Sequence, residues 1–314
     1  MLLDPAKKTG SSESPLNPAE ASRPKTLSEL LDWGKKELEP LGPEEACASA
    51  EFLLAEITGL PRSGLYLGRT AVLEQDLCHK YESLVLARKD RNPLAYLTGT
   101  ACFWEEKLKV NAFCLIPRPE TECMLESFIR VSGFEKRSAF SFLDLGSGSG
   151  AIGVALLRHF EKARAVFSDI SRGALQTARE NAASYGLTER GSFLCADLLE
   201  AFFPDACFDV IFSNPPYFSY DDWARVEPEI LKEPRAALDG GPDGLFFYRR
   251  IAAQAARLLK ADGRVLVEMG EGQAKDVAGI FQEAGFPCVE IFKDDLNLER
   301  VLMAHKKTMD KAHG

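Results

Sequence analysis

The tetrapeptide Asn214-Pro215-Pro216-Tyr217 combines residue types that suit the binding of a flat amino group. Two successive prolines fix φ and lack N–H donors, and Pro215 drives Asn214 toward an extended conformation. The resulting stiff turn presents the side-chain oxygen of Asn214, the carbonyl oxygen of Pro215 and the ring of Tyr217. Two acceptors and one aromatic face would hold both N–H bonds of a planar –NH2 group while the ring stacks on it.

Holding both N–H bonds would solve a chemical problem, because the lone pair of an amide nitrogen is delocalised into its carbonyl. The two acceptors favour pyramidalisation and aim the lone pair at a sulfonium methyl group. Orientation of this kind supplies at most roughly 7–11 kcal/mol. No strong general base is required, since the proton can leave after transfer. The alternative interpretation of the tetrapeptide is an Asx-Pro surface turn.

A glycine-rich turn precedes the tetrapeptide in the chain. Phe142-Leu143-Asp144-Leu145 has the apolar character of a buried strand, and Gly146-Ser147-Gly148-Ser149-Gly150 follows it and opens a helix. Alternate glycines permit a tight turn and a close approach of the backbone to a ligand. Exposed N–H groups at a helix start favour a carboxylate-bearing or anionic group. A strand-to-helix turn without a ligand is the simpler interpretation.

Two further acids end the next two predicted strands. Asp169 lies 25 residues beyond Asp144, where a doubly wound sheet places a carboxylate that can accept both hydroxyl protons of a ribose. Just before Ser171 it could also cap a helix. Asp197 could meet an adenine amino group, with Leu198 against the ring, or serve only in a turn. These features alone would also fit a nicotinamide dehydrogenase, and the tetrapeptide favours a methyl donor instead.

Strands and helices alternate through the second half of the chain, which predicts an α/β fold with a doubly wound, mostly parallel, seven-stranded sheet. The last two strands are too close for a crossover helix, so we expect a final antiparallel hairpin. The predicted strands are Ala139–Asp144, Ala165–Asp169, Ser192–Asp197, Val210–Ser213, Val265–Met269, Val289–Phe292 and Val301–Ala304. The predicted helices are Ala151–Phe160, Ser171–Tyr185, Gly244–Lys260 and Gln273–Ala284.

The first part of the chain has a different pattern. Residues 1–25 are rich in Ser, Pro, Ala and Lys and predict a disordered tail. Residues 26–93 predict a small helical domain, with helices from Thr26, over Pro43–Ile57 and over Leu73–Arg88. Residues 94–118 predict a β-hairpin linker, residues 119–306 the α/β domain and residues 307–314 a second tail. The helical domain could be a packing domain or a docking surface for a protein partner.

Composition limits the partners and the compartment. The net charge of −9 disfavours a nucleic-acid substrate without excluding a local basic patch. Eight scattered cysteines without a CxxC pair predict reduced thiols in the cytoplasm, and four histidines without ligand spacing predict no metal. No apolar run reaches a membrane span, and the N-terminus lacks the apolar core of a signal peptide, so we expect neither membrane association nor secretion.

The sequence from about Leu27 to Ala304 resembles the release-factor glutamine methyltransferases, the PrmC/HemK family. The glycine-rich turn and the tetrapeptide look like that family's cofactor loop and catalytic tetrapeptide. Two other stretches are more diagnostic. They are Leu115-Ile116-Pro117-Arg118-Pro119-Glu120-Thr121-Glu122, preceded by Pro93–Gly99 and Phe103-Trp104, and Glu233-Pro234-Arg235-Ala236-Ala237-Leu238 with Gly240-Gly241 and Gly244-Leu245.

The resemblance implies the class I methyltransferase fold and a set of functional residues. Residues expected to contact S-adenosyl-L-methionine are Asp144, Gly146, Ser147, Gly148, Ser149, Gly150, Asp169, Asp197, Leu198 and Asn214. Asn214, Pro215, Pro216 and Tyr217 are expected to hold the substrate glutamine, with Asn214, Pro215 and Tyr217 as the catalytic residues. The helical domain is expected to help dock a peptide-chain release factor. Residues 1–25 have no family counterpart, and Leu198 stands where relatives can carry an aromatic residue.

Three functions remain distinct at this point. The first is methylation of the glutamine in a release factor's Gly-Gly-Gln motif. The second is methylation of an adenine amino group in DNA or RNA, which would need a flipped base, a basic channel and a target-recognition module that the sequence does not display. The third is a non-catalytic scaffold that binds the cofactor, which has no need of Asn214 and Tyr217.

For the stretch around Pro117, we expect an ion pair between Arg118 and Glu120, and we expect Glu233 to orient Arg235 or cap a turn.

Overall fold

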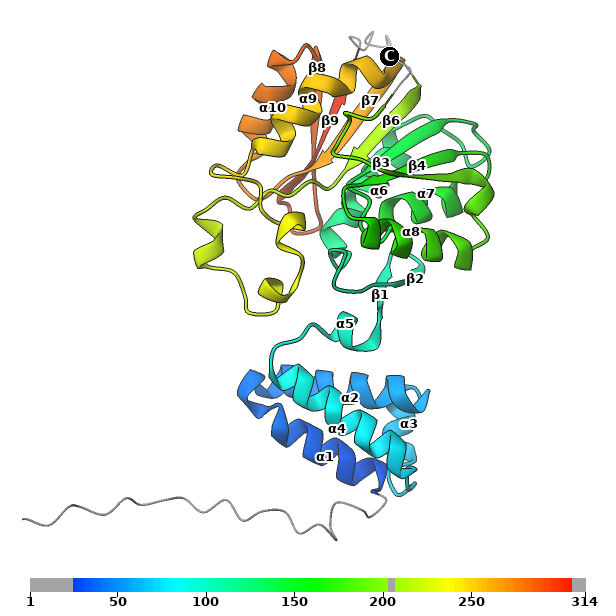
Figure 1. Ribbon diagram of the computed structural model, residues 1–314, viewed down its shortest axis with the longest axis vertical. Coiled ribbons are helices and arrows are strands. Elements are labelled where there is room, and N and C mark those ends of the chain that lie inside the picture. The colour runs from blue at the N-terminus through cyan, green and yellow to red at the C-terminus, as the bar shows by residue number, and fades with distance from the viewer. Residues whose placement is uncertain (1–24, 203–206, 307–314) are drawn as a thin grey trace, which may run out of the picture. The chain divides into compact units, whose positions relative to one another are not determined.

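The computed structural model describes residues 25–202 and 207–306 (Figure 1). The chain divides into two compact units, Met1–Asp90 and Arg91–Gly314. The tails predicted over residues 1–25 and 307–314 fall outside the described residues, except for Lys25.

The first unit is helical. It contains α1 (Leu27–Glu37), the 3-10 helix η1 (Glu39–Leu41), α2 (Pro43–Thr58), α3 (Arg62–Leu67) and α4 (Gln75–Lys89). Thr26 and Glu29 form a capping box that fixes the start of α1. Tyr81 is fully buried and donates to the carbonyl oxygen of Ala50 at 3.2 Å, which ties α4 to α2. The predicted helices are therefore confirmed, and α3 is an additional helix between them.

The second unit is built on one seven-stranded sheet of order β5-β4-β3-β6-β7-β9-β8. Its strands are β3 (Ser141–Leu145), β4 (Arg164–Asp169), β5 (Gly191–Cys195), β6 (Phe208–Ser213), β7 (Leu259–Glu268), β8 (Cys288–Lys293) and β9 (Glu299–His305). Strands β5, β4, β3, β6 and β7 are parallel, whereas β9 is antiparallel to both β7 and β8. The mostly parallel sheet and its final antiparallel hairpin are as predicted.

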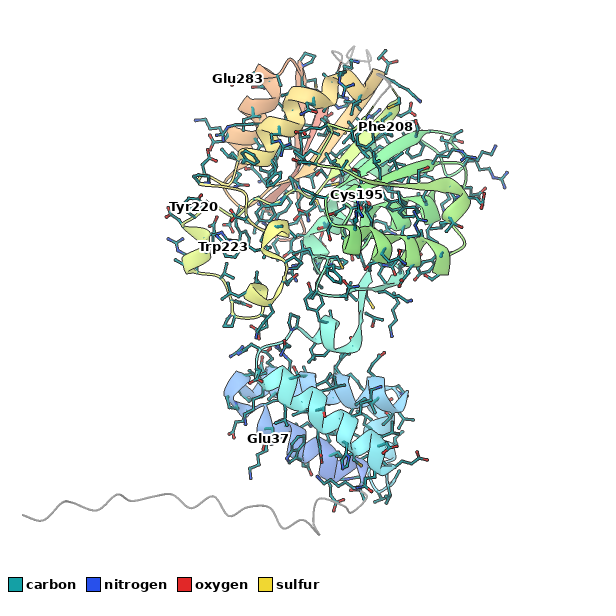
Figure 2. All side chains as sticks on the ribbon, in the orientation of Figure 1. Glu37, Cys195, Phe208, Tyr220, Trp223 and Glu283 are labelled. Carbon is teal, nitrogen blue, oxygen red and sulfur yellow. The ribbon has the colours of Figure 1, made fainter. Side chains whose placement is uncertain are left out.

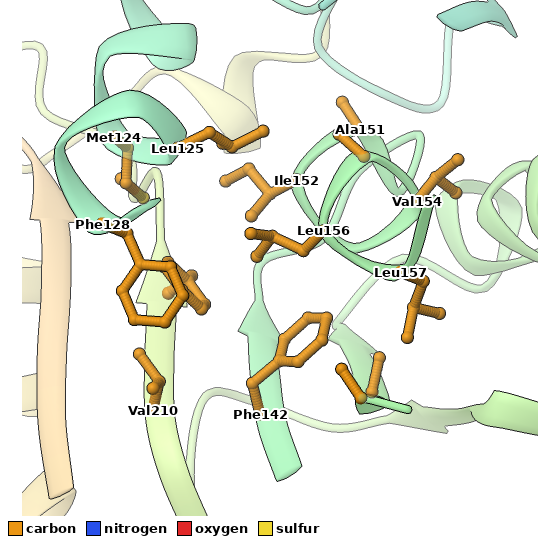
Figure 3. Close-up of a cluster of buried hydrophobic side chains, with 14 of the residues drawn as sticks. Met124, Leu125, Phe128, Phe142, Ala151, Ile152, Val154, Leu156, Leu157 and Val210 are labelled. Atoms are coloured by element: carbon orange, nitrogen blue, oxygen red, sulfur yellow. The ribbon is translucent and has the colours of Figure 1, made fainter. Parts of the chain in front are cut away.

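Helices cover both faces of this sheet (Figure 1). The helices α6 (Pro119–Val131), α7 (Ala151–His159) and α8 (Arg172–Ser184) pack on one face, where Phe128, Phe142 and Phe212 belong to one buried cluster. Figure 3 shows part of this cluster, with side chains of α6 and α7 above those of β3 and β6. The helices α9 (Phe246–Leu258) and α10 (Ala274–Glu283) pack on the other face against Leu143 and Ile211.

Alternation along the strands explains the two clusters. In β3, Phe142 belongs to the α6–α8 side, and Leu143 and Leu145 belong to the α9–α10 side, because successive side chains of a strand point to opposite faces. Both faces are buried, so the strand is a continuous apolar run broken only by Asp144.

In the second unit, two helices and the bounds of several elements differ from the predictions. Helix α6 was not predicted, although Pro119 occupies its first turn, a position where proline is favoured. Helix α5 (Leu94–Thr98) lies in the stretch predicted as a hairpin linker, before the hairpin of β1 (Thr100–Phe103) and β2 (Glu106–Lys109). Strand β7 begins at Leu259, whereas the predicted helix ran to Lys260 and the predicted strand began at Val265, because Leu259 already pairs with Phe208 of β6.

Candidate active site

The glycine-rich turn joins β3 to α7 at the carboxyl edge of the sheet. Gly146, Gly148 and Gly150 have φ of 69°, 54° and 80°, a left-handed conformation that glycine adopts without a Cβ penalty. The N–H groups of Gly146 and Ser147 donate to the carbonyl oxygen of Ser168 in β4 at 2.8 and 3.0 Å. A Cβ on Gly150 would also approach the Cβ of Ala178 in α8 to 3.0 Å. The turn therefore lies close to β4 and α8.

Asp144 lies beneath the glycine-rich turn. Its side chain is buried, it accepts a hydrogen bond from the N–H of Gly153 in α7 at 2.9 Å, and burial raises its pKa to about 7. Asp144 does not line the cavity described below. Direct cofactor contact by Asp144 stays a prediction, and the hydrogen bond from Gly153 shows that its carboxyl group ties the start of α7 to β3.

Asp169 lies beside the turn, at the end of β4. Its carboxylate accepts from the N–H of Gly148 and from the N–H of Ser171, both at 2.8 Å, and burial raises its pKa. An ionised carboxylate has about four lone-pair positions, so acceptor capacity remains for a ligand in the cavity that Asp169 lines. The helix cap is made by Ser171, whose hydroxyl accepts from the N–H of Ala174.

Asp197 and Leu198 follow β5 and line the same cavity. Asp197 accepts two hydrogen bonds from the guanidinium of Arg250 in α9, both at 3.0 Å. Leu198 has a φ of 48°, a conformation that is uncommon for residues other than glycine and that recurs at functional sites. Because Arg250 also lines the cavity, it presents a cation beside the carboxylate of Asp197.

The tetrapeptide follows β6, next to the glycine-rich turn on β3. The side-chain nitrogen of Asn214 donates to the hydroxyl of Thr121 in α6 at 3.0 Å. That hydroxyl donates to the carboxylate of Glu268, at the end of β7, at 2.6 Å. Burial raises the pKa of Glu268 to about 7. Neither Thr121 nor Glu268 was predicted as a site residue.

The backbone of Tyr217 is enclosed by glycines. A Cβ on Gly240 would meet the Cα of Tyr217 at 2.7 Å, and one on Gly244 would meet its carbonyl oxygen at 2.4 Å. That carbonyl oxygen accepts from the side-chain nitrogen of Gln273 at 3.0 Å. Burial raises the pKa of the Tyr217 hydroxyl. The glycines that follow the tetrapeptide in the sequence thus have a steric role around it.

The segment between the tetrapeptide and α9 forms a loop whose two ends are hydrogen-bonded to each other. Phe218 donates its N–H to the carbonyl oxygen of Leu238 at 2.9 Å, and Gly240 donates to the carbonyl oxygen of Phe218 at 2.8 Å. Figure 2 labels Tyr220 and Trp223 on this segment, and the guanidinium of Arg235 lies 4.8 Å from the ring of Trp223. These contacts close the loop at its base and hold the tetrapeptide in place.

Two neighbouring cavities meet at the tetrapeptide. The larger has a volume of about 470 Å³ and runs from the glycine-rich turn past Asp169 and Asp197 to Asn214 and Pro216. The smaller has a volume of about 200 Å³, and its walls include Tyr217, Glu120 and Arg300. The walls of both include Leu115, Arg118, Asn214 and Ala237. Asn214 therefore stands where a ligand in one cavity would face a ligand in the other.

The stretch around Pro117 pairs with a distant part of the chain. Arg118 forms an ion pair with Glu233, whose side chain is buried and also accepts from the N–H of Ile116 at 3.0 Å. Arg235 donates to Asp239 at 3.1 Å. The predicted pairing of Arg118 with Glu120 and the predicted orientation of Arg235 by Glu233 are therefore wrong. The buried carboxylate of Glu233 binds a cation 115 residues away in the sequence and a backbone donor 117 residues away.

The larger cavity has the donors and acceptors that S-adenosylmethionine requires. Within the described part of the chain, the buried hydroxyls of Ser147 and Ser168 have no hydrogen-bond partner, and both residues line the cavity. Orphaned buried polar atoms call for a ligand or a water. Together with the carboxylate of Asp169 and the start of α7, they suit a ligand with hydroxyl groups and a charged amino-acid end.

Comparison with known proteins agrees with this geometry. Residues 29–99 match the PrmC N-terminal domain, and residues 126–247 match the methyltransferase small domain. The release factor glutamine methyltransferase of Rhodospirillum rubrum is 38% identical over 92% of this chain and 88% of its own length. Those of Geobacter sulfurreducens and Caulobacter vibrioides are 38% and 35% identical, over 88% and 91% of this chain and 95% and 99% of their own lengths.

The chain belongs to the release factor glutamine methyltransferase family. A solved structure shares the fold at lower identity. The hMettl16 catalytic domain in complex with MAT2A 3′UTR hairpin 6 has a TM-score of 0.52 and 14% identity, and the match covers 77% of this chain and 86% of that one.

In this member of the family, most of the predicted site residues line one of the two cavities. The larger cavity is lined by Gly146, Ser147, Gly148, Ser149, Asp169, Asp197, Leu198, Asn214, Pro215 and Pro216. Tyr217 lines the smaller one, whereas Asp144 and Gly150 line neither.

None of the helices in residues 25–202 and 207–306 is long and apolar enough to cross a membrane.

Sequence reasoning missed the partners that orient these residues. The unpredicted residues are Thr121, Glu268, Arg250 and the pairing of Arg118 with Glu233. A helix-start signal at Pro119 would have put Thr121 in the first turn of a helix. An acid at the end of an otherwise apolar strand was the available signal for Glu268.

Proposed function

We propose that this chain methylates the side-chain amide nitrogen of the glutamine in the Gly-Gly-Gln motif of a peptide-chain release factor, with S-adenosyl-L-methionine as the donor. The observation that carries the proposal is the position of Asn214 at the junction of two cavities. The larger would hold the donor and the smaller would hold the glutamine side chain. Membership of the family supports the choice of substrate.

The donor, when bound, supplies a methyl group made electrophilic by a positively charged sulfur. The chain's own residues would orient its two ends. The glycine-rich turn and the hydroxyls of Ser147 and Ser168 face the amino-acid end, and Asp169 accepts from the ribose hydroxyls. Asp197, with Leu198, is proposed to lie near the adenine. Charge-assisted hydrogen bonds of the type offered by Asp169 contribute roughly 1.5–3 kcal/mol each.

The substrate amide would be held by the tetrapeptide. The side-chain oxygen of Asn214 and the carbonyl oxygen of Pro215 accept its two N–H bonds, and the ring of Tyr217 stacks on its plane. With both N–H bonds fixed, the nitrogen lone pair points into the larger cavity. After transfer the nitrogen loses one proton to solvent, so the reaction needs no strong base at this site.

The first unit, which includes most of the match to the PrmC N-terminal domain, is proposed to help dock the release factor. The described residues of this unit carry more acids than bases, 12 against 8 over residues 25–90, which does not favour a nucleic-acid partner. All eight cysteines are free thiols, which supports a cytoplasmic location for the reaction.

The substrate assignment is tested with purified protein, isotopically labelled S-adenosylmethionine and two release factors. One is the natural factor and the other carries an alanine in place of the motif glutamine. We expect one labelled methyl group on the natural factor, located on that glutamine by peptide mass spectrometry. Equal labelling of the two factors would refute the substrate assignment.

The cofactor assignment has a separate test. Asp169→Asn removes the negative charge that faces the cavity, so we expect the Kd for S-adenosylhomocysteine, measured by calorimetry, to rise about 10- to 100-fold. Asp276→Asn, at an exposed position of α10, is the matched control and should leave the Kd unchanged. An unchanged Kd in Asp169→Asn would remove Asp169 from the cofactor site.

A further inference from the structure

Asn214, Thr121 and Glu268 form a chain of hydrogen bonds that leads away from the cavities. The Asn214 nitrogen lies 3.0 Å from the Thr121 oxygen, and that oxygen lies 2.6 Å from a Glu268 oxygen. Asn214 follows β6, Thr121 is in α6 and Glu268 ends β7. Relative exposure is 4% for Thr121 and 1% for Glu268, so water does not compete for these bonds.

The donors and acceptors in this chain can be arranged in one way when Glu268 is ionised. A carboxylate only accepts, so the Thr121 hydroxyl must donate its proton to Glu268. The Thr121 oxygen then has only lone pairs left for its other partner. Of the two ends of the Asn214 amide, only the –NH2 end can donate to it. Side-chain amide ends are otherwise similar in shape and size, so such a network decides their orientation.

We infer that Thr121 and Glu268 are positioning residues that hold the amide of Asn214 with its oxygen toward the bound substrate. This inference rests on the proposed function, in which that oxygen accepts a proton of the glutamine –NH2 group. In the opposite orientation the –NH2 group of Asn214 would face the –NH2 group of the substrate. Two donors would then oppose each other, and the lone pair of the substrate nitrogen would no longer point into the larger cavity.

The surroundings of Glu268 are consistent with this role. Two charged residues that line the smaller cavity act on the Glu268 carboxyl group: the charge of Glu120 raises its pKa, and the charge of Arg300 lowers it. The hydroxyl of Tyr248 donates to the backbone carbonyl of Glu268 at 2.9 Å and leaves the carboxylate to the side chains of Thr121 and Asn214. Hydrogen bonds from Thr121 and Asn214 to the Glu268 carboxylate also lower its pKa, against the effect of burial.

The decisive variant is Thr121→Val, which removes the hydroxyl and keeps the branched shape. By analogy with residues that orient metal ligands, whose loss typically costs about 10- to 100-fold in affinity or activity, we expect kcat for the release factor to fall by that factor with little change in the Kd for S-adenosylhomocysteine. Thr121→Ser restores the hydroxyl and should recover most of the loss. Wild-type kcat in Thr121→Val, or no recovery in Thr121→Ser, would overturn the inference.

The chain offers a matched control for the loss of a buried threonine hydroxyl. Thr177 in α8 also accepts from an asparagine amide, that of Asn111 at 2.8 Å, and donates to the carbonyl oxygen of Gly173 at 3.1 Å. Thr177→Val removes the same pattern of bonds from a residue that lines neither cavity. We expect it to lower stability while changing kcat far less than Thr121→Val. Equal losses of kcat in the two variants would mean a general structural effect and would contradict the inference.

A second readout does not depend on methyl transfer. The side-chain –NH2 signals of Asn214 in a ¹⁵N-labelled protein are identified by their absence in Asn214→Ala. With S-adenosylhomocysteine bound, we expect their exchange with solvent to be slower in the wild type than in Thr121→Val. Protected signals in a protein that does not methylate a release factor would refute the proposed function and leave the positioning role in place. Equally fast exchange in both proteins would refute the positioning role itself.

Discussion

Asn214 lies between the protein interior and the two cavities. The side-chain nitrogen of Asn214 donates a hydrogen bond to Thr121 in the interior, and Asn214 also lines both cavities. In the proposed function, the side-chain oxygen of Asn214 accepts from the –NH2 group of the substrate. A residue with this placement should affect the rate of transfer more than the binding of the cofactor.

Replacing Asn214 by alanine tests this expectation. Removal of one hydrogen-bonding group that acts in the transition state typically lowers kcat by about 10²–10³. We expect a loss of this size in Asn214→Ala, measured with saturating release factor and cofactor. The Kd for S-adenosylhomocysteine, measured by calorimetry, should stay close to the wild-type value. Activity near the wild type would exclude Asn214 from the mechanism.

Helix α7 depends on a glycine at its crossing with the sheet. A Cβ on Gly153 would lie 2.2 Å from a ring carbon of Phe167 in β4 and 2.9 Å from the carboxylate of Asp144 in β3. The N–H of Gly153 also donates to that carboxylate. The close approach of α7 to β3 and β4 therefore fixes both the helix and the glycine-rich turn that begins it.

Two glycine-to-alanine variants separate this contact from the general effect of alanine in a helix. Gly153→Ala forces the ring of Phe167 or the helix to move, and we expect a loss of about 1–3 kcal/mol in the free energy of unfolding. Gly279 in α10 has open space at its Cβ position, so Gly279→Ala should raise stability by about 0.5–1 kcal/mol.

Both values can be measured by urea unfolding followed by circular dichroism. Opposite signs for the two variants are the expected result. Equal and stabilising effects would show that α7 has room for a methyl group, which would contradict the close contact between Gly153 and the ring of Phe167.

Two buried carboxyl groups link the stability of the whole molecule to pH. Burial raises the pKa of Asp144 and of Glu268 to about 7, from ordinary values of 3.8 and 4.5. In both cases the folded state holds its proton more tightly than the unfolded state does. Their contribution to stability is fully present below the unfolded pKa, and it is lost as pH rises through about 7.

Glu268→Gln isolates the contribution of one of these groups. At about 1.4 kcal/mol per pH unit, the change in the pKa of Glu268 corresponds to roughly 3 kcal/mol between low and high pH. We expect the free energy of unfolding to fall more in the wild type than in Glu268→Gln on going from about pH 5 to about pH 8.5. Urea unfolding at both values gives the comparison. Identical losses in the two proteins would mean that Glu268 titrates near its ordinary pKa when folded.

Local patterns in the sequence determined the fold and the edge of the sheet where the site lies. Strand-and-helix alternation predicted the seven-stranded sheet, and the glycines predicted a tight turn, in which Gly146, Gly148 and Gly150 have a left-handed backbone. Asp169, Asp197 and Asn214 could be assigned to one edge because parallel strands end at the same edge. These inferences need only a few neighbouring residues and the handedness of the fold.

Tertiary structure alone decided which side chains meet. Asp144 and Asp169 look alike in the sequence, but one is buried under α7 and the other faces the cavity. Asn214 reaches Thr121 across 93 residues, and Thr121 reaches Glu268 across 147. A buried carboxylate takes the donor that packing brings within hydrogen-bonding distance, and the packing of distant segments is not encoded in any short stretch of sequence.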